Sequence, residues 1–156
     1  MNQKSEHETI SFLLGQICRE QRGLANEELT KVGLYAGQEM FLWQLWQQDG
    51  LAQSQLVEQM CVQPPTVSKM LDRMEKSGLV VRRPDSDDSR ISRVYLTEQG
   101  RNLEKSVCGV WAHLEQRVSQ GLSVEERVLL RRLLLQVYGN LTQKLSVTAE
   151  QSGARR

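Results

Sequence analysis

Apolar residues recur at steps of three and four over most of this chain, the spacing that places them on one face of an α-helix. The first such run begins at Ile10 and predicts a helix that extends to about Leu24. Asn26, Thr30 and Gly33 follow in a less regular segment, which we expect to be a connection that contains a short helical piece.

A dense apolar stretch lies between Tyr35 and Gln48. Its apolar residues are concentrated in a few turns: Met40, Phe41, Leu42, Trp43, Leu45 and Trp46. Because they cover most of the circumference of a helix, the stretch is typical of a central helix that is mostly buried. The Asp49-Gly50 pair is expected to end it.

Two shorter helices are predicted next, in the helix-turn-helix arrangement. The first runs from about Ala52 to Met60. The second begins at Pro64, because a proline pair is tolerated only in the first turn of a helix. It ends at Gly78, since glycine is common just past a helix end. The few residues between the two helices predict a tight turn.

The second of these helices has two distinct faces. Its apolar face carries Val67, Met70, Leu71 and Met74, and its polar face carries Thr66, Ser68, Lys69, Asp72, Arg73 and Lys76. Short hydroxyl side chains near the start of a helix suit base edges in the major groove, and long basic side chains reach phosphates. A solvated charged face would show the same pattern, so the neighbouring segments decide between the two interpretations.

After Gly78 the apolar pattern changes from helical to alternating. Leu79–Pro84 is rich in strand-forming residues, Asp85–Ser89 is typical of a turn, and Ser92–Leu96 alternates again. A two-stranded hairpin directly after a helix-turn-helix is a wing. Four arginines lie on or beside it, at positions 82, 83, 90 and 93, although neighbouring aspartates offset much of their charge.

Two long helices are predicted to follow the wing. Thr97 caps the first, which carries one apolar stripe and ends near Gly121. Ser123 and Glu126 form the Ser-x-x-Glu pattern of a capping box at the start of the second, which extends to Leu145. These helices and the first one carry more apolar surface than a winged-helix core needs, which predicts a homodimer. The alternative is that the helices cover one another within a monomer.

The predicted fold class is therefore mainly α, with a small β-hairpin wing. The expected organisation is an N-terminal dimerisation helix over 1–34, a winged helix-turn-helix domain over 35–100, dimerisation helices over 101–147 and a loose tail over 148–156.

The composition narrows the classes of protein that this chain can belong to but does not identify a function. The 156 residues carry a net charge of only +1, so DNA binding must depend on local placement of basic residues. Cys18, Cys61 and Cys108 are widely spaced and odd in number, which favours reduced thiols in the cytoplasm. No targeting segment or membrane span is expected. His7 and His113 lack partners at metal-ligand spacing and catalytic motifs are missing, so we expect no metal, no cofactor and no enzyme.

The stretch from Leu51 to Gly100 resembles the MarR family of bacterial winged-helix transcription regulators. The matching pieces are P-T-V-S at 65–68, L-D-R-M-E-K-S-G-L at 71–79, R-R-P-D-S-D-D-S-R at 82–90 and Y-L-T-E-Q-G at 95–100. The likeness extends with weaker specificity over most of Ile10 to Leu145. It implies a dimeric regulator of transcription, a repressor ahead of an activator, that binds palindromic double-stranded DNA.

The resemblance also implies roles for individual residues. The major groove and its phosphates would face Pro64, Pro65, Thr66, Ser68, Lys69 and Arg73. Arg90 would enter the minor groove, held by Asp88, which agrees with the attraction of a narrow minor groove for arginine. Arg82 and Arg83 are expected to divide between phosphate contact and local pairing, and Asp72 to form an ion pair with Arg73 or a wing arginine.

One position departs from the family pattern, and three alternatives stay open. Ala52 stands where the family has Thr or Ser, which leaves the start of that helix between Ala52 and Ser54. The open alternatives are an oxidant sensor that uses Cys61 or Cys18, a winged-helix module that binds protein, and release by a small-molecule effector. Cysteine is more often an inert, buried residue than a sensor. The tryptophans at 43, 46 and 111 would suit an effector cleft but are more often core, and no ligand residues are assigned.

Overall fold

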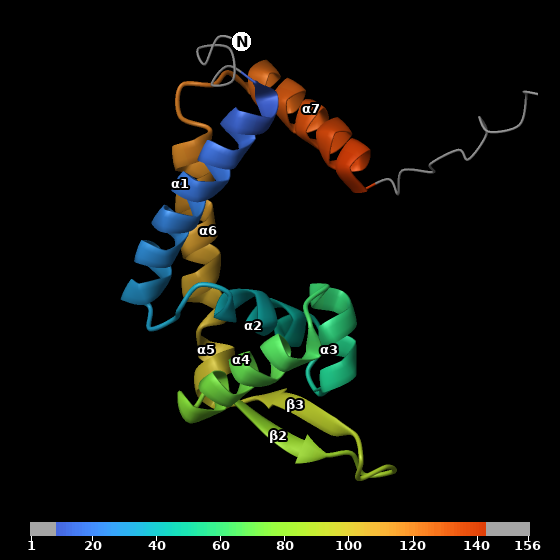
Figure 1. Ribbon diagram of the computed structural model, residues 1–156. Helices are drawn as coiled ribbons and strands as arrows, with labels where there is room; N and C mark the ends of the chain where they lie inside the picture. Colours follow the sequence, from blue (N-terminus) through green and yellow to red (C-terminus); the bar gives the residue numbers. More distant parts are fainter. Residues whose placement is uncertain (1–8, 143–156) are drawn as a thin grey trace, which may run out of the picture. The chain divides into compact units, whose positions relative to one another are not determined.

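A computed structural model describes residues 9–142, which are mainly helical with one small antiparallel sheet, as predicted. The chain divides into two compact units between Arg117 and Val118, and each unit is described by itself. The elements, all labelled in Figure 1 except β1, are α1 (Ile10–Lys31), α2 (Gln38–Gln47), β1 (Leu51–Ala52), α3 (Gln53–Met60), α4 (Pro64–Lys76), β2 (Val80–Pro84), β3 (Ser92–Leu96), α5 (Glu98–Asn102), α6 (Glu104–Val118) and α7 (Val124–Thr142).

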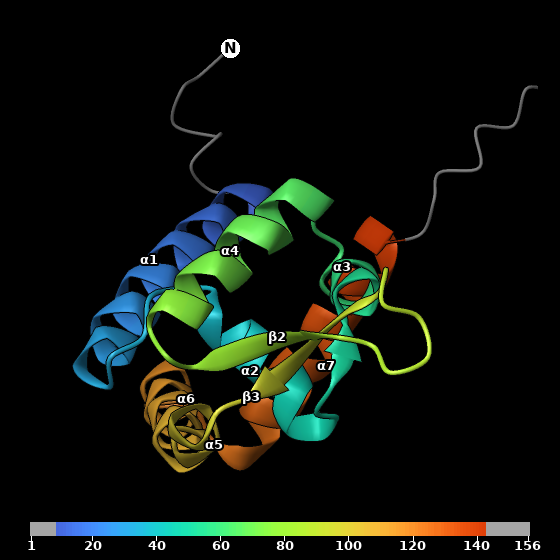
Figure 2. The same cartoon turned by 90° about the horizontal axis from the view of Figure 1, so that it is seen from below.

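The sheet has the strand order β1-β3-β2, and both pairings are antiparallel. The hairpin pairs Val80 with Leu96 at its base and Pro84 with Ser92 near its turn. The strand β1, whose Ala52 pairs with Arg93, was not predicted from the sequence. Seen from below, the hairpin lies in front of α2 (Figure 2). Because β3 pairs with β1 and Arg82 of β2 pairs with Asp72 of α4, the wing is joined to the segment before α3 as well as to α4.

One apolar core joins the helix-turn-helix to the sheet and to parts of α1 and α6. Its fully buried side chains include Leu42 and Leu45 of α2, Leu56 of α3, Leu71 and Met74 of α4, Val80 and Val94 of the sheet, Leu29 of α1 and Val107 of α6. Val94 and Leu96 face this core from β3, as the alternating pattern predicted. Burial of this apolar surface is the main force that fixes α4 against the wing.

The prediction that α1 ends near Leu24 is wrong, because the helix continues to Lys31. Ala25 and Leu29 are buried and extend the apolar face by one further turn. Thr30 stabilises that turn by donating its hydroxyl hydrogen to the carbonyl of Asn26 at 2.7 Å. Gly33, with a φ of +81°, follows the helix end.

The expectation of a mostly buried helix at α2 is only partly correct. Phe41, Leu42 and Leu45 are buried, but Met40 and Trp43 are 45% and 44% exposed. The apolar residues of α2 therefore form a buried face and an exposed one.

The single helix predicted after Thr97 is two helices, α5 and α6. Thr97 caps α5 by accepting the backbone N–H of Gly100, as predicted. The carbonyl of Gly100, which in a continuous helix would bond only to residue 104, accepts the indole N–H of Trp46 at 3.0 Å. The hydrogen bond from Trp46 of α2 therefore lies next to the break between α5 and α6.

The second unit contains α7, and its start confirms the predicted capping box. Ser123 Oγ accepts the backbone N–H of Glu126 at 3.2 Å, and Glu126 Oε2 accepts the backbone N–H of Ser123 at 2.7 Å. No side chain of α7 is buried. The predicted helix end at Leu145 and the predicted tail lie outside the described residues.

Candidate nucleic-acid interface

The first turn of α4 is exposed and begins at the proline pair, as predicted. Gln63 is the cap residue, and its carbonyl accepts the backbone N–H groups of Thr66 at 2.9 Å and Val67 at 3.2 Å. Pro64 and Pro65 have no N–H to donate, so this helix end presents pyrrolidine rings and a hydroxyl rather than free amides.

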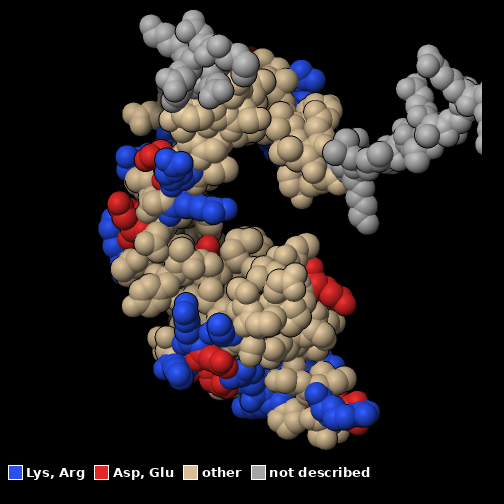
Figure 3. Space-filling view, in the orientation of Figure 1, with Lys and Arg blue, Asp and Glu red and all other residues tan. Residues whose placement is uncertain are grey.

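The two predicted faces of α4 are present. Val67, Leu71 and Met74 are completely buried, and Met70 is partly buried. The opposite side exposes Thr66, Lys69, Arg73 and Lys76, while Ser68 is half-buried. Lys and Arg side chains gather over α4 and the hairpin, with acidic side chains among them (Figure 3).

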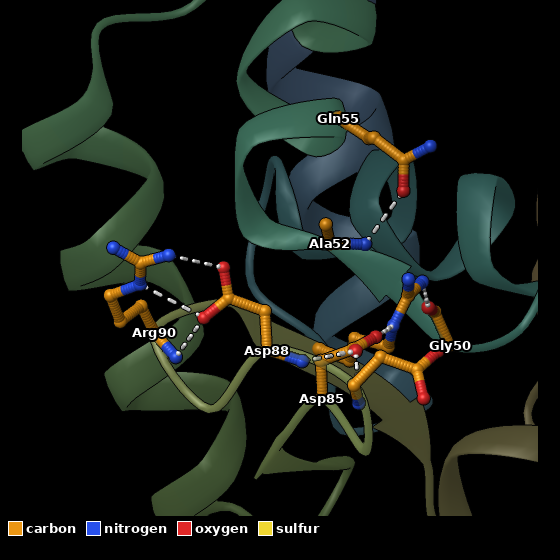
Figure 4. Close-up of polar contacts among 8 residues, drawn as sticks. Gly50, Ala52, Gln55, Asp85, Asp88 and Arg90 are labelled. Carbon is orange, nitrogen blue, oxygen red and sulfur yellow. Dashed lines mark hydrogen bonds and ion pairs between the residues drawn. The ribbon is translucent and has the colours of Figure 1, made fainter.

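The start of α3, left open by the sequence, falls at Gln53 with Ala52 as the cap residue. Ala52 has no side-chain oxygen to accept a hydrogen bond from the helix. The Gln55 side chain compensates in part, since its Oε1 accepts the backbone N–H of Ala52 at 2.8 Å (Figure 4). At the other end of α3, Cys61 adopts a left-handed conformation with a φ of +51°.

Asp85 organises the turn of the wing, a role that was not predicted from the sequence. Its Oδ1 accepts the backbone N–H groups of Asp87 at 2.8 Å and Asp88 at 3.1 Å, and its Oδ2 pairs with the Nε of Arg93 (Figure 4). The Arg93 ion pair and the two amides lower the pKa of Asp85 to about 2. Arg93 also donates to the carbonyl of Gly50 at 3.0 Å, which ties the wing to the loop after α2.

The wing tip carries the arginine fork that the sequence suggested. Arg90 donates from Nε to Asp88 Oδ1 at 3.0 Å and from Nη2 to Asp88 Oδ2 at 3.1 Å (Figure 4). The Arg90 side chain is nevertheless 89% exposed. The pairing with Arg90 lowers the pKa of Asp88, so the carboxylate stays ionised and holds the guanidinium in one orientation.

The two arginines of β2 have different surroundings. Arg82 pairs with Asp72 and Glu75 of α4, which confirms the expected ion pair between Asp72 and a wing arginine. Arg83 is exposed, with its guanidinium carbon 5.8 Å from the centre of the Tyr95 ring. Glu75 was not singled out from the sequence, because nothing local marks it as a partner of a residue seven positions later.

Two adjoining grooves lie between α1, α2 and α6. One of about 360 Å³ is lined by Glu39, Met40, Trp43, Cys108 and Trp111, and the other, of about 530 Å³, shares Glu39, Met40 and Trp111. Burial raises the pKa of Glu39. Trp46 packs against the core instead, in edge contact with Trp43.

All three cysteines are exposed, contrary to the interpretation of Cys as a buried residue.

Within residues 9–142, no group of His, Cys, Asp or Glu side chains is placed to hold a metal ion. The helices in that range are also too short or too polar to cross a membrane.

These elements define the class of the protein as a winged helix-turn-helix protein. Residues 34–92 match the sequence model described as the MarR family. The uncharacterized HTH-type transcriptional regulator YybA of Bacillus subtilis (strain 168) is 24% identical over 128 residues, which are 82% of this chain and 85% of YybA.

Solved structures agree with this match. The transcriptional regulator SlyA is 28% identical with a TM-score of 0.74, over 85% of this chain and 93% of that one. MepR of S. aureus, crystallised with DNA, is 28% identical with a TM-score of 0.72, over 85% and 96% of the two chains. A mutant MarR of E. coli with operator DNA, 24% identical, shares the fold with a TM-score of 0.76 over 88% and 99%.

The chain is therefore similar to transcriptional regulators of the MarR family, both in the sequence of residues 34–92 and in its fold.

Proposed function

We propose that this protein is a homodimeric repressor that binds a palindromic DNA operator sequence-specifically. The observation that carries the proposal is the pairing, within one unit, of an exposed polar face on α4 with an exposed, carboxylate-held arginine at the wing tip. The solved complex of MepR with DNA supports the extension to this chain.

In this proposal α4 enters the major groove with its first turn leading. Pro64, Pro65, Thr66 and Ser68 face base edges, while Lys69 and Arg73 neutralise phosphates. Because the proline pair offers no amide, its rings suit apolar contact, for example with a thymine methyl group.

The wing supplies a second contact in the adjacent minor groove. Arg90 inserts there, and Asp88 restricts its guanidinium so that less side-chain entropy is lost on binding. Arg83, which is exposed on β2, binds a phosphate beside that groove in this proposal.

The second copy is proposed from the exposed apolar surface. Ile10, Leu13 and Ile17 of α1 are about half exposed or more, and α7 exposes a larger set: Val124, Val128, Leu129, Leu130, Leu133, Leu134, Leu135, Tyr138 and Leu141. Apolar surface of this extent on a single protein indicates a partner. A two-fold dimer would present two α4 helices to half-sites about one helical turn, roughly 34–36 Å, apart.

Selection of bound duplexes from a random pool tests DNA recognition, half-site spacing and symmetry together. We expect enrichment of an inverted repeat whose affinity falls steeply with salt, because bound phosphates release counterions. Replacement of Arg90 by Ala should weaken binding clearly and leave the oligomeric state unchanged. A pool that stays random at low ionic strength contradicts the proposal.

Regulation by a small molecule is proposed as part of the same function. The grooves between α1, α2 and α6 give an effector access to the junction of the α1 helix and the winged core. An effector that binds one spacing of the two α4 helices better than another shifts the dimer toward that spacing. Loss of operator binding in its presence, with the dimer intact, is the expected result.

A thiol-based sensor is the second candidate, favoured by the exposure of Cys61 in the turn before α4. Modification there would disturb the docking of α4. Peroxide should then release operator DNA from the parent protein and fail to do so from Cys61→Ser. Equal release from both proteins excludes Cys61 as the sensor.

A further inference from the structure

Arg82, like Arg93 and unlike the exposed Arg83 and Arg90, has its charge directed into the protein. Its Nη2 donates to Asp72 Oδ1 at 2.6 Å and to Glu75 Oε2 at 2.8 Å, and its Nε donates to the same Glu75 oxygen at 3.1 Å. The side chain is 26% exposed, compared with 89% for Arg90. One guanidinium therefore faces two carboxylates, and this cluster offers no net positive charge to a phosphate.

Glu75 holds the backbone of β2 as well as the guanidinium. Its Oε1 accepts the backbone N–H of Arg82 at 3.0 Å. The hydrogen bonds from the Arg82 backbone and side chain hold the pKa of Glu75 below its ordinary value. Asp72 and Glu75 are three residues apart on α4, so both carboxylates lie on the same side of the helix, the side toward β2.

The cluster joins two elements that the chain connects by a short turn. Only residues 77–79 separate α4 from β2. The backbone N–H of Leu79 bonds to the carbonyl of Met74 at 2.9 Å, and Thr97 Oγ1 donates to the carbonyl of Gly78 at 2.6 Å. The planar guanidinium fork adds a directional link about one helical turn further back along α4.

We propose that Arg82 is a positioning residue, which fixes the angle between α4 and the hairpin so that both contact DNA at the same time, and that it does not contact DNA itself. Of the two roles expected for Arg82 and Arg83, phosphate contact and local pairing, this assignment gives Arg82 the local pairing. It rests on the proposed DNA-binding function.

Salt dependence separates the two roles. Affinity for the selected operator is measured by fluorescence anisotropy over a series of salt concentrations, for the parent, Arg82→Gln and the matched control Arg83→Gln. We expect Arg82→Gln to weaken binding about tenfold with an unchanged slope of log affinity against log salt. Arg83→Gln should reduce the magnitude of that slope by about 0.9 for each phosphate that Arg83 neutralises. An equal reduction of slope in Arg82→Gln overturns the proposal.

Two further variants test geometry against charge. Lysine can replace arginine at a phosphate but cannot reproduce the fork, so Arg82→Lys should bind nearly as weakly as Arg82→Gln. Glu75→Gln removes a negative charge near DNA, and charge alone would strengthen binding. Loss of the link to β2 should instead weaken it, so tighter operator binding by Glu75→Gln overturns the proposal.

Amide hydrogen exchange provides a readout that does not need DNA. Exchange in β2 and β3 should be faster in Arg82→Gln than in the parent, and unchanged in Arg83→Gln. Circular dichroism verifies that each variant is folded. If the parent binds no duplex, the proposed function fails while the exchange experiment still tests the link. If exchange in Arg82→Gln matches the parent, the positioning role is wrong.

Discussion

Gly100 has no room for a side chain. A Cβ atom there would overlap the backbone carbonyl oxygen of Leu79, which cannot move without disturbing the start of β2. Gly100→Ala is therefore expected to lower the free energy of unfolding by about 3 kcal/mol, measured by chemical denaturation.

Gly109 provides the matched control for that change. It lies in α6 with open space where a Cβ would stand. Gly109→Ala should raise the free energy of unfolding by about 0.5–1 kcal/mol, because alanine favours a helix. Equal effects of the two substitutions would show that crowding at Gly100 is unimportant.

Glu39 gives the stability of the protein a pH dependence. Burial raises its pKa, so the folded protein binds more protons at this site than the unfolded chain does. The contribution of Glu39 is therefore most favourable below the ordinary carboxyl pKa of 4.5 and is lost as pH rises. Glu39→Gln should match the parent near that pH and exceed it in stability at neutral pH. A constant difference across this range, in thermal unfolding, would contradict the assignment.

Residues that act through a local pattern were predictable, and residues that act through distant partners were not. The fork between Asp88 and Arg90 spans two positions, and the resemblance to the MarR family already implied it. Asp85 and Glu75 accept hydrogen bonds from Arg93 and Arg82, eight and seven positions later, across a change from one element to another. The spacing of residues along the chain does not show which arginine pairs with which carboxylate, so these pairings could be identified only from the structure.

At the level of elements, a better cap residue at the start of α3 should make the protein more stable. Gln55 already supplies the reciprocal half of a capping box, and Ala52 lacks the hydroxyl of the other half. Ala52→Ser should raise the free energy of unfolding by about 1 kcal/mol in chemical denaturation. Gln55→Ala, which leaves the Ala52 N–H without this acceptor, should lower it. A loss of stability in Ala52→Ser would mean that the buried site has no room for the hydroxyl.

Element boundaries were predictable where a residue type or a short pattern is common at only one position of a helix. The proline pair fixed the start of α4, and Ser123 with Glu126 fixed the start of α7. The end of α1 was missed because Asn26 and Thr30 are usual in connections, yet here Thr30 bonds back to the helix. β1 was missed because two residues are too few to show alternation, and its pairing depends on β3.

At the level of the whole molecule, the apolar surface of α7 predicts that assembly depends on this helix. Leu134 and Leu141 are 45% and 77% exposed. Their joint replacement by Glu should convert a dimer to a monomer in analytical ultracentrifugation, because charges are costly in an apolar interface. Helical content should remain, and operator affinity should fall at least about a hundredfold because the two half-sites are no longer bound together.

The control for this experiment is Gln136→Glu, a charge change on the same helix at an exposed polar position. It should leave both the mass and the affinity unchanged. A double leucine variant that sediments like the parent would place the interface elsewhere.

The wing is fastened at three places: through Arg82 to α4, through Arg93 to the loop after α2, and through the sheet to β1. The hairpin and the helix that precedes it therefore cannot reorient independently. In the proposed dimer, a signal from outside this unit would therefore move the hairpin and α4 together. Its effect on operator binding would then depend on the distance between the two copies of this unit rather than on the shape of either.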